Sequence, residues 1–521
     1  MATVLTRPPG RAVIPIPQTP PRSVTVPPSY VEFGWRRIVV VAGVMMAALL
    51  QTIDATIVNV ALPTIQGNLG ATVDEATWVV TAYVIANIVV IPMTPWLQTR
   101  FGRKNYFLVS IAGFTVASML CGLATSLPML VAFRVVQGVF GGGLLPTSQV
   151  VLRDTFPPEA LGTSQSIFAV GAVLGPSIGP TLGGILTDNL SWQWVFDVNL
   201  LPGILACVVL AVFLRGNESK KSSVDVPGIV LLTVAIGALQ YVLDQGQHDD
   251  WFNNSTICVM AVVSAVAAIG FVWRELVAKS PVVDVRVLAQ IPVTAGSLIA
   301  VGIGTIIYGG LLILPQYVIG ILGFTSTLAG ILIGIRALPI ALLTITVGKI
   351  ANHPRTHLPA MIATGLVIAS VSCIWLARVI TTGSVLTSFV PPLLLMGFGT
   401  TFVYTPTLVA TLRAVKPSDI PKAAAFITLF AQLGGSVAAA SLVAFIERRA
   451  DFHQAVLAAA ATLDRPAVSS FLQQHSLTQL ASIVTTQSST MAFADGFFIT
   501  GVVGLLTVPL PFLTLMKGAR S

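Results

Sequence analysis

Charged side chains are scarce in this sequence. Asp, Glu, Lys and Arg make up 9% of its 521 residues, whereas 55% of the residues are hydrophobic. Ordinary soluble domains contain about 25% charged residues, so this composition excludes a soluble globular domain and predicts a protein that crosses a membrane many times. The net charge is +8, but no basic patch with interleaved aromatic residues accompanies it, and we therefore expect no binding of nucleic acid.

Cysteine is also rare, and no signal peptide is recognisable. The four cysteines all lie in apolar segments, without Cys-x-x-Cys or Cys/His spacing: Cys121, Cys207, Cys258 and Cys373. This pattern excludes a disulfide framework and a cysteine-based metal site, so we expect neither a metal nor a cofactor. Residues 1–30 contain eight prolines and lack the apolar core of a signal peptide. We predict that residues 1–37 form a disordered cytosolic tail.

Long apolar runs dominate the remainder of the chain. Fourteen of them reach about 20 residues, the length that an α-helix needs to cross a bilayer. They lie at 38–63, 77–98, 105–124, 128–151, 162–186, 194–214, 226–244, 255–275, 293–320, 326–348, 358–378, 384–412, 422–446 and 493–515. The sequence therefore predicts an all-α polytopic membrane protein with fourteen transmembrane helices. Its parts are a six-helix bundle (38–214), two linking helices (215–290) and a second six-helix bundle (291–521).

The positions of the cations support this count. Of the 28 lysines and arginines, 22 fall in the tail and in alternate turns on one side, 4 on the other side and 2 within helices. Because cytoplasmic loops carry the excess of Lys and Arg, we expect both ends of the chain in the cytosol. A faint repeat, PWLQTRFGRK from Pro95 and GKIANHPR from Gly348, is consistent with two related halves. Secondary transporters have such halves, with a binding site between them near the membrane midplane.

The segment 447–491 is the one long connection between predicted spans. It alternates Ala, Leu and Val with polar residues, so short amphipathic helices on the external side are expected there. A connection of this length is unusual and suggests a role such as docking a partner. A solvated excursion without a specific role is the alternative.

One carboxylate lies deep within an apolar run. Asp54 is part of QTIDATIVNVALP, from Gln51 to Pro63. A charged side chain at the centre of a spanning helix costs about 2.5–3.5 kcal/mol on insertion scales, so it needs a partner, a proton or a water-filled cavity. We interpret Asp54 as a proton-exchanging group; the alternative is a structural tie between helix 1 and a neighbour.

Two arginines pose the same problem in other helices. Arg134 shares one face of helix 4 with Gln137 and Gly138, because the three stand at positions i, i+3 and i+4. A guanidinium stays charged in proteins, so Arg134 is a candidate partner or relay for Asp54, or a tie to a helix end. Arg336 lies in IGIRALP of helix 10 and needs a partner in the second half.

Helix 5 carries a glycine every four residues. Gly171, Gly175, Gly179 and Gly183 fall on one helical face, and Pro176 and Pro180 directly follow two of them. Small residues at this spacing let another backbone approach closely, and prolines loosen the helix at that contact. We interpret this face as a hinge and seal; a generic packing groove is the alternative.

These residues together resemble the major facilitator superfamily and, within it, the fourteen-helix drug:proton antiporters of the EmrB and QacA type. The resemblance runs from about Arg36 to Lys517. The segments that carry it are Ile53–Pro63 in helix 1, Arg134–Gly138 in helix 4, Gly171–Gly184 in helix 5, Leu243–Gly246 and Asp250–Phe252 after helix 7, and Gln432–Ser436 in helix 13. Of these two types, the sequence resembles the EmrB type more closely.

The resemblance implies a function and a set of site residues. A protein of this type is a proton-coupled exporter of hydrophobic or amphipathic compounds that works by alternating access in the cytoplasmic (inner) membrane, among membrane lipids, sometimes with a periplasmic adaptor and an outer-membrane channel. Asp54 and Arg134 would then couple protons. Substrate-cavity or gating roles would fall to Gln51, Gln137, Gly138, Gly171, Gly175, Pro176, Gly179, Gly183, Arg336 and Gln432, and the cytosolic turn motif to Arg100, Gly102 and Arg103.

Some positions depart from the family pattern. Thr99 stands before Arg100 where the turn motif normally has an Asp, Pro95 replaces its leading Gly, and Ala431 stands where an Arg is common. A narrow-range transporter of a metabolite, lipid or siderophore is the alternative within the same fold. A membrane-embedded enzyme is less favoured, because the sequence lacks the His-Glu-x-x-His and Asp-x-x-Asp spacings of such enzymes.

Overall fold

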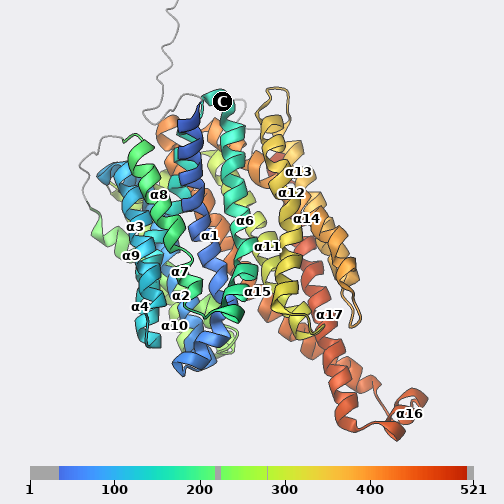
Figure 1. Cartoon of the computed structure of the whole chain (residues 1–521). Coiled ribbons are helices and arrows are strands. Elements are labelled where there is room, and N and C mark those ends of the chain that lie inside the picture. The colour runs from blue at the N-terminus through green and yellow to red at the C-terminus, as the bar shows by residue number, and fades with distance from the viewer. Residues whose placement is uncertain (1–33, 217–223, 279, 513–521) are drawn as a thin grey trace, which may run out of the picture.

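The computed structural model describes residues 34–216, 224–278 and 280–512, and its long helices run side by side (Figure 1). The predicted tail lies mostly outside these residues. Within them, thirteen helices are long and apolar enough to cross a membrane. A further helix, α11 (Ile291–Gly320), has 30 residues. The prediction of an all-α polytopic protein with fourteen spanning helices is therefore confirmed.

The first half of the chain forms one bundle. Its helices are α1 (Trp35–Leu69), α2 (Val73–Phe101), α3 (Arg103–Gly122), α4 (Leu127–Gly141), α5 (Leu144–Thr155), α6 (Leu161–Asn189), α7 (Trp194–Asp197) and α8 (Leu200–Phe213). Two predicted spans are interrupted. The fourth divides into α4 and α5 at Gly142 and Gly143, and the sixth divides into α7 and α8.

The second half forms the other bundle, and two helices connect the two. The connecting helices are α9 (Val226–Gln245) and α10 (Ser255–Val277). The second bundle contains α11, α12 (Ser326–Asn352), α13 (Leu358–Val379), α14 (Leu386–Ala414), α15 (Ile420–Ala460), α16 (Pro466–Gln474) and α17 (Leu477–Leu506). In Figure 1 the blue-to-green first bundle and the yellow-to-red second bundle meet where α6 lies beside α12.

Helix pairs that cross between the bundles bring the halves together. α6 packs along α12, and α2 packs along α15, while α9 rests on α2 and on α15. Leu408 of α14 and Ile427 of α15 belong to the same buried apolar cluster as Leu50 of α1 and Leu144 of α5. The contact between the halves is therefore packed with apolar side chains in this conformation.

The long connection differs from its prediction. α15 continues to Ala460, fourteen residues beyond the predicted end of its span, and α17 begins at Leu477 instead of 493. Together with α16 these extensions project away from the bundle (Figure 1). Arg449 donates to Asp495 over 2.6 Å, and a ring nitrogen of His453 lies 2.8 Å from the same carboxylate. Hydropathy marks where apolar sequence ends, and here the polar sequence remains helical because these contacts join α15 to α17.

Candidate functional site

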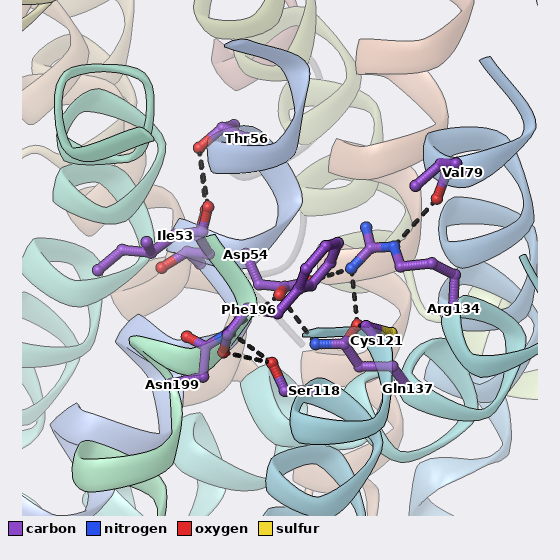
Figure 2. A network of polar contacts seen from close by, with 11 residues as sticks. Ile53, Asp54, Thr56, Val79, Ser118, Cys121, Arg134, Gln137, Phe196 and Asn199 are labelled. Carbon is purple, nitrogen blue, oxygen red and sulfur yellow. Dashed lines mark hydrogen bonds and ion pairs between the residues drawn. The ribbon is translucent and has the colours of Figure 1, made fainter. Parts of the chain in front are cut away.

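The carboxylate of Asp54 is the centre of a buried polar network inside the first bundle (Figure 2). Asp54 is 0% exposed, and its Oδ2 accepts a hydrogen bond from Nη1 of Arg134 over 2.6 Å. Its Oδ1 accepts from Nε2 of Gln137 over 2.8 Å and from Nδ2 of Asn199 over 3.0 Å. Three side chains from α4 and the start of α8 therefore hold one carboxylate of α1.

Arg134 is also buried, and both its Nη1 and its Nε have hydrogen-bond partners. Its Nη1 also donates to Oε1 of Gln137 over 2.7 Å, and its Nε donates to the carbonyl of Val79 over 3.0 Å. The guanidinium carbon lies 4.0 Å from the centre of the Tyr83 ring, where the negative face of the ring attracts a cation. Breaking a buried pair of this kind leaves an uncompensated charge, which is strongly destabilising.

Gly138, one residue after Gln137, explains how α4 comes so close to α2. A Cβ atom on Gly138 would lie 2.5 Å from the backbone oxygen of Tyr83. A side chain here would push α4 away from α2 and so separate Arg134 from the Val79 carbonyl. The absence of a side chain at Gly138 therefore lets Arg134 reach the Val79 carbonyl.

The network includes Asn199 and Ser118, which were not predicted. Asn199 lies at the break between α7 and α8 and bonds both Asp54 and Ser118, whose hydroxyl donates to the carbonyl of Phe196 over 2.8 Å. Both side chains are buried, with exposed fractions of 2% and 0%. A buried Asn and a buried Ser are ordinary in membrane helices, so their only sequence signal was an Asn immediately before an apolar run.

Gln51 lies one turn before Asp54 on α1, and its hydrogen bonds are made with α5 and α2. Its Oε1 accepts from the backbone N–H of Leu145 over 3.0 Å, and its Nε2 donates to Oδ1 of Asn87 over 3.1 Å. Leu145 stands in the first turn of α5, where a backbone N–H has no partner within its own helix. Gln51 therefore caps the second segment of the interrupted fourth span.

The glycine face of α6 packs on α1. A Cβ atom on Gly171 would lie 2.7 Å from Cε of Met45, and one on Gly175 would lie 2.5 Å from Cβ of Thr52. A Cβ atom on Gly179 would lie 3.0 Å from the backbone oxygen of Ile53, and one on Gly183 would lie 2.6 Å from that of Ile57. Pro176 lies within the continuous helix α6. The closely packed partner of this face is thus the helix that carries Asp54.

Another side of α6 faces the second bundle. Near one end of the pair, Gly162 and Gly348 are in backbone contact, and Asn352 Oδ1 accepts from the Gly162 N–H over 3.1 Å. Near the other end, a Cβ atom on Gly330 would lie 2.9 Å from the Cα of Thr181. α6 therefore lies between α1 and α12, in close contact with both.

The segment Gly175–Gly179 also has the Gly-x-Ser-x-Gly spacing found around hydrolase nucleophiles, and its structure does not fit that chemistry. Such a serine stands on a sharp turn between a strand and a helix, with its hydroxyl exposed. Ser177 instead lies inside α6, 1% exposed, and donates to the carbonyl of Val173 over 3.3 Å. Its hydroxyl is a helix-internal hydrogen-bond donor.

The turn between α2 and α3 contains the predicted turn motif. Gly102 joins the two helices with φ of +79°, a conformation that favours glycine. Arg103 forms an ion pair with Asp154 at the end of α5, and Arg153 reaches the same carboxylate over 2.7 Å. Arg100 lies in the last turn of α2. Thr99 donates to the carbonyl of Pro95. Asp154, which was not predicted as a site residue, supplies the carboxylate for this turn.

Two predicted site residues lie apart from the Asp54 network. Arg336 is buried in the second bundle, and its Nη1 donates to the carbonyl of Ile307 over 3.1 Å. Gln432 is half-buried on α15, beside the place where Gly304 of α11 meets the carbonyl of Ala431. Within the described ranges, no group of three or more His, Cys, Asp or Glu side chains could hold a metal ion.

Comparison with known proteins identifies relatives along most of the chain. A family model described as Major Facilitator Superfamily matches residues 44–439. Multidrug export protein EmrB of Escherichia coli (strain K12) is 30% identical over 426 residues, which cover 81% of this chain and 83% of that protein. Multidrug export protein EmrB of Haemophilus influenzae is 31% identical over 491 residues, covering 91% and 95%.

A solved structure shows the same fold at much lower identity. The proton:xylose symporter XylE of the major facilitator superfamily is similar with a TM-score of 0.58, over 92% of this chain and 96% of that one, at 11% sequence identity. This likeness concerns the fold alone. The predicted resemblance is confirmed by the sequence relatives, and the chain belongs to the major facilitator superfamily of transporters, to its EmrB type.

Proposed function

We propose that this protein is a proton-coupled exporter of hydrophobic or amphipathic compounds that works by alternating access. The observation that carries the proposal is the Asp54 carboxylate, fully buried inside the first bundle and balanced by one cation, Arg134. A buried ion pair of this kind costs desolvation and is weak evidence of a stabilising role, so a functional reason is needed. The names of the EmrB relatives, multidrug export proteins, support the substrate class.

Protonation of Asp54 would change the forces within the network. A neutral carboxyl no longer balances Arg134, and one of its oxygens becomes a donor among groups that are arranged to donate to it. Gln137 and Asn199, which both donate to Oδ1, would then hold α1 less firmly against α4 and α8.

Movement of α1 would reach the contact between the halves through α6. The glycine face of α6 leaves almost no gap to α1, and the opposite contacts of α6 are made with α12 of the second bundle. Closely packed helices shift as units because packed interfaces have few intermediate arrangements. We infer that Gly171, Gly175, Gly179 and Gly183 transmit a change at Asp54, with Pro176 easing the bend.

The substrate path would open between the bundles. The apolar contact that includes Leu144, Leu408 and Ile427 is closed in this conformation. Parting α5 from α15 would open the region of α5 that Gln51 caps. A path with few polar groups among apolar walls suits compounds that are mainly hydrophobic.

The orientation and the partners are part of the same proposal. The bias of the cations supports both chain ends in the cytosol and residence in the cytoplasmic (inner) membrane, surrounded by lipid. The extension formed by α15, α16 and α17 lies at the other side on this topology. It is a suitable surface for a periplasmic adaptor that leads to an outer-membrane channel.

Reconstituted vesicles test the proposal. Asp54→Asn should be less stable, since it leaves Arg134 without its counter-charge. In vesicles with an imposed proton gradient it should still fold and bind a transported dye, but it should no longer exchange the dye for protons. Asp197→Asn is the matched control, because Asp197 is a half-buried acid on neighbouring α7 outside the network, and we expect it to retain exchange. Full proton-driven efflux by Asp54→Asn would move the coupling site to another acid.

A further inference from the structure

The second bundle contains a buried arginine whose donors are only partly used. Arg336 is 3% exposed, and of its guanidinium only Nη1 has a hydrogen-bond partner, the carbonyl of Ile307 at 3.1 Å. Nε and Nη2 are both buried and have no partner among the described residues. These two nitrogens form one edge of the guanidinium plane, the edge that can meet both oxygens of a carboxylate at once.

Arg336 lies on the wall of a small cavity between five helices. The other walls come from α11, α12, α13, α14 and α17, and they are glycine or apolar side chains: Gly310, Leu314, Ile333, Leu376, Leu393, Met396 and Phe497. The cavity measures about 10 Å³, close to the smallest volume that admits one water-sized guest. A larger guest would enter only as the surrounding helices part.

A balancing negative charge is missing from this part of the described structure. Arg336 forms no ion pair with any described residue, whereas Arg134 in the first bundle is paired with Asp54 over 2.6 Å. Among the side chains that the structure describes, the neighbouring titratable group is the buried thiol of Cys373. An isolated cation in apolar surroundings is costly, and an anion that meets its free edge would remove most of that cost.

We propose that Arg336 is the anchor of an anion-binding site in the second bundle. The chemistry that fits it is a single negative charge with two acceptor atoms, such as a carboxylate, next to an apolar group. The apolar walls favour an amphipathic carboxylate over a fully hydrated ion, so the proposal rests on the proposed export function and adds a substrate class to it. A small free anion such as chloride shares the charge and is the second source to be tested.

Binding to the purified full-length protein in detergent tests the site without any proton gradient. We would titrate 4-phenylbutyrate and, separately, its neutral counterpart 4-phenylbutan-1-ol, and measure the melting temperature, which rises when a ligand binds the folded state. A third titration exchanges sodium isethionate for sodium chloride at constant ionic strength. Because export is not measured, failure of this site and failure of proton coupling at Asp54 remain distinguishable.

Three variants test separately the charge of Arg336, the geometry of its two free nitrogens and the volume of the cavity. Arg336→Met removes the charge, and Arg336→Lys keeps a charge but loses the two-nitrogen edge. Gly310→Ala leaves Arg336 intact and places a methyl group 3.6 Å from Nη1 and 3.8 Å from Met396, at ordinary contact distance, so the fold should persist while the cavity narrows.

The expected result is a saturable rise in melting temperature with 4-phenylbutyrate and none with the alcohol. The apparent affinity should fall at least about tenfold in Arg336→Met, because the hydrogen bonds to the charged ligand are lost. It should also fall in Gly310→Ala, because the cavity is narrower. Saturable stabilisation by chloride that is lost in the same variants would assign the site to free anions. Equal stabilisation by acid and alcohol, or unchanged affinity in both Arg336→Met and Gly310→Ala, would overturn the proposal.

Discussion

The two bundles are built alike but treat their buried charges differently. In the first, glycines of α6 bring its backbone against α1; in the second, a Cβ atom on Gly434 of α15 would lie 2.7 Å from the Cα of Val301 on α11. Among the described residues, each bundle also encloses an arginine that is at most 3% exposed. Arg134 has a carboxylate, an amide, a carbonyl and an aromatic ring around it, whereas Arg336 has one carbonyl.

This difference indicates a division of labour. A cation that is balanced by a carboxylate responds to the protonation of that carboxylate, so the first bundle is suited to sense protons. A cation with a free hydrogen-bonding edge responds to an arriving anion, so the second bundle is suited to bind a ligand. On the functions proposed above, the two similar halves differ in their buried charges and not in their packing.

Removal of the paired cation should have the largest effect on stability. Arg134→Met leaves the Asp54 carboxylate buried without its counter-charge, and we expect the free energy of unfolding to fall by about 3–5 kcal/mol. Thermal melting of the purified protein would measure this. The double variant Asp54→Asn with Arg134→Met should recover part of the loss, because neither charge is then uncompensated. A double variant no more stable than Arg134→Met alone would mean that the pair is not coupled.

The same substitution in the second bundle should act in the opposite direction. Arg336→Met replaces a buried cation that lacks a counter-charge by an apolar side chain of similar length, so in the absence of anions we expect stability to rise by about 1–4 kcal/mol. The comparison uses the same melting experiment as Arg134→Met. A loss of stability similar to that of Arg134→Met would erase the contrast between the bundles and would indicate that Arg336 is already satisfied.

Substitution on the glycine face should have the smallest effect on stability and a clear effect on transport. Gly175→Ala forces Cβ against Thr52, where overpacking costs about 1–3 kcal/mol, and it should impair export while the protein remains in the membrane. Gly67→Ala is the control on α1, because nothing lies within 4 Å of its added Cβ. Normal export by Gly175→Ala would show that the contact between α6 and α1 does not move during transport.

Much of this architecture could be predicted from hydropathy and charge. Spanning helices are apolar over a fixed length, and alternate turns carry the cations, so the number of spans followed directly from the sequence. The depth of Asp54 and Arg134 in apolar runs also predicted that each needs a partner, and the structure joins the two. Burial of charge has so large a cost that sequence alone reveals where a partner is required.

The rest depended on tertiary contacts that leave a weak signal in the sequence. Asn199 and Ser118 complete the Asp54 network because the break between α7 and α8 turns them inward, and breaks of this kind are set by packing. In the sequence, Asp154 is an ordinary acidic residue at a helix end, and only the tertiary structure brings Arg103 into contact with it. Gly175 and Gly179 were expected at a moving contact, but the sequence could not tell whether that contact was with α1 or with α12.

The helical extension beyond the bundle amplifies any rotation of the second bundle. From residue 447 to Ala460 the continuation of α15 comprises fourteen residues and so reaches about 21 Å, and its ties to α17 through Asp495 make it turn with the second bundle as one body. A small rotation of that bundle therefore becomes a larger displacement at the tip. A pair of spin labels, one at Ser469 in α16 and one on the first bundle, would convert the transport cycle into a measurable change of distance.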